Sequence, residues 1–150
     1  MHSLFDPAVA QEVRSRIVAV RADSPRLWGK MNLAQALAHC SGALEIAVGD
    51  ASPPRMMIGR LLGWLIKPLA LGNDKPMAKN SPTVPSLVIA NERDVDAERQ
   101  RLLALFDRFV GAGPAGCTKN PHAFFGRLTP VEWGTLSYKH LDHHLRQFSA

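Results

Sequence analysis

Three of the six histidines of this 150-residue chain lie within five positions, at His140, His143 and His144. A helix-start signal precedes them: Thr129 is followed by a proline and, three residues on, by a glutamate, so we expect a helix over residues 129–148. On a helical wheel His140 and His144 fall on the apolar face about one turn apart, whereas His143 lies at the rim. Two imidazoles on a buried face could therefore direct ring nitrogens at one point.

Neutral imidazole is a good ligand for divalent zinc, nickel, copper or iron, but two ligands rarely suffice. The best candidate for a third is His39, which lies at the edge of the buried stripe of another expected helix. Three histidines would leave coordination positions open to water or substrate, as in catalytic rather than structural sites. Such an ion can acidify a bound water or thiol, or polarise a carbonyl.

A histidine pair four residues apart is also compatible with two partly buried side chains that are hydrogen-bonded to carbonyls or waters. His143, three residues after His140, is the second choice for the pair. Leu141 follows His140 where the zinc-peptidase motif requires a glutamate base, so the pattern does not indicate a peptidase.

Four further residues are candidates for the wall of a pocket or for contacts with the metal ligands. His122 precedes two phenylalanines in an aromatic loop and could line a pocket mouth, although a surface histidine is the simpler interpretation. Trp28 could wall a ligand site or pack in the core. The other two are His143 and Gln35.

Apolar periodicity and end signals predict an all-α bundle with four principal helices and one additional short helix. A long connection rich in proline, in which Pro68, Pro76, Pro82 and Pro85 recur, separates the third and fourth segments, and loops of this length usually cover something or serve function. The expected helices span approximately residues 6–22, 32–49, 56–69, 94–110 and 129–148.

The segment from Met56 to Leu69 is apolar almost all round, and Gly59 and Gly63 would allow close backbone approach. We expect a buried or partly buried helix here, in preference to a dimer contact or a contact with a membrane surface. The wider run to Leu71 is too short and too polar to span a membrane.

Length, charge and cysteine content indicate which classes of protein and partner the chain does not fit. The chain has the length of one domain, residues 1–150, and its net charge of +5 comes from scattered basic residues, which argues against a nucleic-acid groove. Two cysteines are too few for a disulfide scaffold, and the first 20 residues lack the features of a secretory signal. We therefore expect a cytoplasmic protein with reduced thiols and with neither nucleic acid nor membrane as a partner.

Several segments of the chain together resemble one protein superfamily. They are Leu27–Met31 with Gln35 and His39-Cys40; Lys75-Pro76 with Asn80–Thr83; His122–Pro130; and Trp133-Gly134 with Tyr138–Phe148. These segments resemble the DinB/YfiT-like superfamily, and especially a branch known only as a domain of unknown function. One departure is Ala123, where that pattern has proline directly after His122.

The resemblance implies an up-and-down four-helix bundle that holds one nickel or zinc ion. Carried over to this chain, the ligands are one histidine of the second helix, His39, and the pair His140 and His144 of the last. Characterised relatives include transferases and isomerases in which the metal activates a low-molecular-weight thiol, and many are homodimers. The resemblance does not specify the reaction.

The sequence thus favours a metal-binding bundle that activates a thiol or water for transfer to, or hydrolysis of, a small molecule. The alternative is a non-catalytic dimeric binding module whose histidines have structural roles. A third interpretation, an anion- or nucleic-acid-binding domain, predicts binding with a steep salt dependence, and the scattered charges argue against it.

Overall fold

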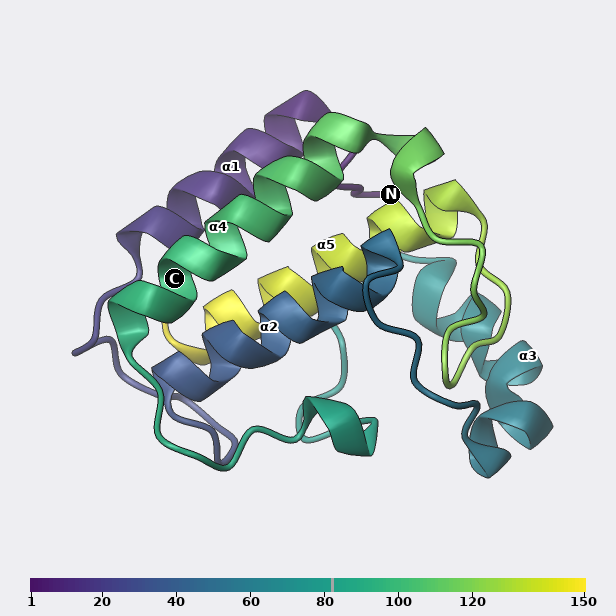
Figure 1. Cartoon of the computed structure of the whole chain (residues 1–150), viewed down its shortest axis with the longest axis horizontal. Coiled ribbons are helices and arrows are strands. Elements are labelled where there is room, and N and C mark those ends of the chain that lie inside the picture. The colour runs from purple at the N-terminus through teal and green to yellow at the C-terminus, as the bar shows by residue number, and fades with distance from the viewer. Residues whose placement is uncertain (82) are drawn as a thin grey trace.

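The computed structural model describes residues 1–81 and 83–150, so Pro82, expected within the connection, lies outside the described residues. The described residues form helices and no β-strand, which confirms the all-α expectation (Figure 1). The helices are α1 (Pro7–Ala19), α2 (Leu33–Val48), α3 (Met57–Leu71), η1 (Pro85–Leu87), α4 (Val95–Ala112), η2 (Pro114–Gly116) and α5 (Pro130–Gln147). No helix in this described part combines the length and apolarity of a membrane span.

Local signals position the helix ends. Asn32 and Thr129 each close a capping box with the residue three positions on, so α2 and α5 begin where the sequence predicts. Gly49 ends α2 in the left-handed conformation, with φ +90°. Helix α1 ends at Ala19, three residues earlier than expected, because Val20 is extended and buried and its carbonyl accepts from Arg99.

Four helices surround the apolar core. Helix α2 packs against α4 and α5, and α1 packs against the same two helices (Figure 1). The largest side chains that are almost fully buried come from all four helices and from Leu4: Phe106, Phe109, Ile17, Leu44, Leu102, Leu141 and Val13. This packing keeps α2 and α5, which carry the candidate histidines, side by side.

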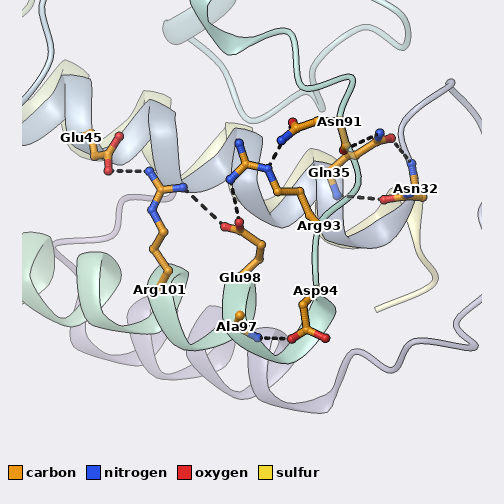
Figure 2. Close-up of polar contacts among 9 residues, drawn as sticks. All are labelled: Asn32, Gln35, Glu45, Asn91, Arg93, Asp94, Ala97, Glu98 and Arg101. Carbon is orange, nitrogen blue, oxygen red and sulfur yellow. Dashed lines mark hydrogen bonds and ion pairs between the residues drawn. The ribbon is translucent and has the colours of Figure 1, made fainter.

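Ion pairs link α4 to α2 at the edge of this core. Arg101 Nη2 lies 2.6 Å from Glu45 Oε1, and Glu98 accepts from both Arg101 and Arg93 (Figure 2). Partly exposed pairs of this kind contribute at most about 1 kcal/mol each. Their main effect is to align the two helices.

Helix α5 is buried on more than its apolar side. The carboxylate of Asp142 is 2.8 Å from Arg16 Nη1 of α1, and Arg146 Nε lies 2.8 Å from its other oxygen. Lys139, on the same helix, is only 7% exposed. The core therefore covers much of α5, so that Lys139 and Asp142 are buried although they are charged.

The third helix is partly buried, which is the weaker of the two forms of burial that the sequence predicts. Helix α3 buries only Gly59, Gly63 and Leu71, and seven large apolar side chains are exposed: Met57, Ile58, Leu61, Leu62, Trp64, Leu65 and Leu69. The physical reason is that its narrow glycine face approaches the backbone at Phe124, where no side chain would fit. A helix that docks through small residues leaves its large ones outside.

Gly59→Ala tests this docking. The added Cβ would lie 2.5 Å from the Phe124 carbonyl oxygen and 2.6 Å from its Cα, and backbone atoms cannot move aside cheaply. We expect a loss of roughly 1–3 kcal/mol in the free energy of unfolding, with faster amide exchange across α3. Gly111→Ala in α4 is the matched control, because nothing lies within 4 Å of its added Cβ. The Gly111→Ala variant should be more stable than wild type by about 0.5–1 kcal/mol. Equal changes in the free energy of unfolding for the two variants would contradict the close contact between α3 and the Phe124 backbone.

Candidate functional site

His39 of α2 meets His140 and His144 of α5 in a compact cluster. Their ring centroids are 4.8 Å apart in all three pairs. One ring nitrogen from each lies within 4.8 Å of the other two, so together they could hold a metal ion. The spacing of one turn on α5 and the contact of α5 with α2 thus bring together the three residues that the sequence singled out.

The proton of His39 is located by its partner. His39 Nδ1 lies 2.7 Å from the carbonyl oxygen of Leu87, at the end of η1. A carbonyl can only accept, so Nδ1 carries the hydrogen and donates it. In the neutral ring Nε2 is then left with a free lone pair.

The proton of His144 is located in the same way. His144 Nδ1 lies 2.8 Å from Gln147 Oε1, and Gln147 Nε2 donates to the Trp28 carbonyl at 2.8 Å. Because that carbonyl needs a donor, the amide must turn its oxygen to His144, which donates from Nδ1. The Nε2 atom of His144 therefore also keeps its lone pair. Histidines that bind metals usually have their second nitrogen held in this manner.

The third imidazole faces the first directly. His140 Nε2 lies 2.9 Å from His39 Nε2, which can only accept. Either His140 donates a proton there, or both lone pairs point at a shared cation. Ligand atoms around a tetrahedral zinc are roughly 3.3 Å apart. The ring nitrogens of the three histidines are between 2.9 and 4.8 Å apart, a range that includes this value. Small side-chain adjustments would therefore let the three imidazoles bind one divalent ion.

Burial keeps the cluster uncharged. Desolvation, with a smaller contribution from the neighbouring His39, lowers the pKa of His144 to about 3. Desolvation also lowers the pKa of His39, and it lowers that of His140 well below the usual value, with repulsion from the neighbouring imidazoles adding to the effect. Metals bind neutral imidazole, so all three side chains are in the ligating form at neutral pH.

His143 lies outside the cluster, at its rim as the wheel predicts. Its ring is 5.4 Å from that of Trp28 and 5.0 Å from that of His144. The ammonium of Lys79 lies 4.4 Å over the Trp28 ring, within cation–π range. Trp28 and His143 thus form one wall beside the histidine cluster, with Lys79 stacked on Trp28.

His122 holds a loop rather than joining the cluster. Its Nδ1 accepts from the backbone N–H groups of Phe124 and Phe125, at 3.1 and 3.2 Å. Burial, with a smaller effect from Arg55, lowers its pKa to about 4, so the ring stays neutral and keeps both hydrogen bonds. The loop that it orders is the one on which α3 docks.

Gln35 has a structural use. Its Oε1 accepts from the Asn32 backbone in the capping box, and its Nε2 donates to the Asn91 carbonyl (Figure 2). The contacts that orient the histidines come instead from Leu87 and Gln147. Neither contact was predicted from the sequence. The spacing of three residues between His144 and Gln147 on one helix indicates that their side chains could meet, whereas no sequence pattern indicates which backbone carbonyl will face His39.

The cluster opens onto a cavity of about 1440 Å³. Its walls come from α2, α3, α5, the 73–90 connection and the 122–125 loop, and they include Trp28, Gln35, His122 and His143. Cys40 also lines it, but burial raises the pKa of that thiol, which therefore stays protonated. Burial likewise raises the pKa of Cys117 to about 11. Neither cysteine is suited to act as a nucleophile at neutral pH.

The chain matches the family model described as "Protein of unknown function (DUF1569)" over residues 7–150. Curated proteins give no match, and solved structures give none either. The expected place in a domain-of-unknown-function family is thus confirmed, while the DinB/YfiT-like relationship stays a prediction. Because the match covers nearly the whole chain, the chain belongs to the DUF1569 family.

Proposed function

We propose that this protein binds one divalent transition metal ion, nickel or zinc, through His39, His140 and His144, and that it is a metal-dependent enzyme. One observation carries the proposal. Two of the three imidazoles donate their Nδ1 hydrogen to an oxygen of the protein, at 2.7 and 2.8 Å, which leaves Nε2 lone pairs for a common ligand.

The chemistry would be activation of a thiol or a water for transfer to, or hydrolysis of, a small molecule. A divalent ion held by three histidines acidifies such a ligand at its open positions. The protein supplies neutral imidazoles, holds their orientation through Leu87 and Gln147, and encloses the reacting groups in a mainly apolar cavity. The substrate, a low-molecular-weight thiol among the candidates, would enter that cavity.

We further propose that the chain is a single domain, an up-and-down four-helix bundle of the DinB/YfiT-like type. Supporting this, α1, α2, α4 and α5 pack around one core, and the histidines come from the second and the last of these helices. The free cysteines suit the cytoplasm, and the exposed side of α3 suits a homodimer.

The alternative is a non-catalytic binding module. Its supporting observation is the 2.9 Å contact between His39 and His140, which would then be a hydrogen bond donated by His140. In that case the three histidines satisfy one another and the cavity serves only to hold a ligand. Metal content separates the two proposals.

The first prediction is that the protein, supplied with nickel or zinc and then desalted, keeps about one ion per chain, measured by atomic emission. His39→Ala, His140→Ala and His144→Ala should each lower the affinity by about 100-fold or more, because two imidazoles remain. His143→Ala is the matched control and should bind as wild type. Folded wild-type protein with no retained metal would refute the metal site and favour the binding module.

The second prediction concerns Gln147→Met, which keeps the side-chain size but removes the acceptor of His144 Nδ1–H. The free ring can then change tautomer and turn, so metal affinity should fall roughly 10- to 100-fold. Competition with a chromogenic chelator measures this change. Gln100→Met, on the exposed side of α4, is the control. Unchanged affinity in Gln147→Met would contradict the orienting role.

The third prediction is acid destabilisation of the metal-free protein. The folded pKa of His144 is about 3, below the ordinary value, so the unfolded chain takes up its proton first as the pH falls. Stability is therefore greatest above about pH 6.5 and falls by roughly 1.4 kcal/mol per pH unit for each such histidine. Urea unfolding between pH 7 and pH 5 should show a slope that is shallower in His144→Ala. Identical slopes would contradict the lowered pKa.

A further inference from the structure

The walls of the cavity carry charge of one sign. Among the described residues that line it there is no aspartate and no glutamate, whereas Lys30, Lys75 and Lys139 are present beside five histidines. A cavity with cations and no carboxylate favours an anionic occupant over a neutral or cationic one.

Lys139 is the most informative of these cations, since it is only 7% exposed. Its Nζ donates to the carbonyl oxygens of Ala70 and Asn73, at 2.5 and 3.0 Å, so one of its three hydrogens remains for another acceptor. In the described part of the chain it forms no ion pair. The nearby carboxylate of Asp74 pairs instead with the N-terminal amine and His2. A buried ammonium without a counter-ion is costly, and a bound anion would offset that cost.

Two indole groups add hydrogen-bond donors. Trp28 Nε1 and Trp133 Nε1 are both buried and have no hydrogen-bond partner among the described residues, and both side chains line this cavity. Trp133 is only 2% exposed. Buried donors normally have partners, so two unsatisfied N–H groups at one cavity indicate an occupant that accepts hydrogen bonds.

Most of the remaining wall is apolar. Helix α3 contributes Ile58, Ile66 and Leu69, and α5 contributes Leu136. Ligand cavities usually have volumes of about 300–1,000 Å³. At about 1440 Å³ this one is larger, so it can take an extended or bulky apolar body.

We propose that the cavity binds an anionic amphipathic small molecule, with a carboxylate or similar oxyanion head on an apolar chain. The head accepts hydrogen bonds from Lys139 and from the indole N–H of Trp28, whose ring packs against His143 one helical turn from Lys139, and the chain lies along the apolar wall toward Trp133. That this molecule belongs to the substrate class rests on the proposed function. Its binding requires no metal and is measured independently.

The test uses isothermal titration with three probes that share a ten-carbon chain: decanoate, decanol and decyltrimethylammonium, with a chelator present. A charge-assisted hydrogen bond contributes about 1.5–3 kcal/mol. Decanoate should therefore bind about tenfold or more tightly than decanol, with the cation weakest. Equal affinities, a preference for the cation, or no saturable binding would each overturn the inference.

Variants locate the binding site. Lys139→Met should remove most of the preference for decanoate and leave decanol binding unchanged, whereas Lys119→Met, an exposed loop lysine outside the cavity, should change neither. If circular dichroism shows that Lys139→Met is unfolded, Trp28→Phe takes its place, because it removes only the indole donor on the Lys139 side of the cavity. Decanoate affinity that does not fall in the folded variant refutes the proposal.

A cavity-filling variant tests whether the probes bind inside the cavity, and metal loading separates this inference from the proposed metal centre. Ala43→Trp places a large side chain in the lining and should abolish binding of decanoate and decanol together. Chain binding that survives there would locate it elsewhere and overturn the proposal. Wild-type protein that binds decanoate but retains neither nickel nor zinc would refute the metal centre alone, while metal binding without decanoate binding would refute this inference alone.

Discussion

The candidate metal site depends on where the protons of three imidazoles lie, one of them buried and two partly buried. A cluster of histidines binds a cation only if lone pairs, and not N–H groups, point at its centre. Here Leu87 and Gln147 take the Nδ1 hydrogens of His39 and His144, and burial keeps the rings neutral. Each orienting contact comes from a different part of the chain, so the cluster forms only when the connection and the end of α5 are both in place.

The core supplies the rigidity that this arrangement needs. Helices α2 and α5 begin at capping boxes and are enclosed by α1 and α4, so the facing histidine positions are set by well-packed backbone. The ion pair of Arg16 with Asp142 ties α5 to α1 on the side away from the cavity. Asp142 also pairs with Arg146, so its buried carboxylate keeps one cation even when Arg16 is removed.

The cavity owes its shape to segments outside the four packed helices. The proline-rich connection, the loop ordered by His122, and α3 close around the histidine side of α5. Helix α3 meets that loop through two glycines, and this explains why an apolar helix lines a cavity with a few side chains and exposes the rest. The result is a mainly apolar cavity whose lining also includes lysines, histidines and two indole groups.

The sequence alone determined the helices, because caps, glycines and apolar periodicity act over a few residues and are visible in one dimension. It also separated His140 and His144 from His143, since rotation along one helix is set by spacing. Only the tertiary structure decided the partner of His39, the backbone carbonyl at Leu87 and the uncompensated charge of Lys139. It likewise decided the exposure of α3, because a wholly apolar helix carries no signal for which side will be covered. Such features arise from contacts between segments far apart in the chain, and neither residue type nor local spacing encodes them.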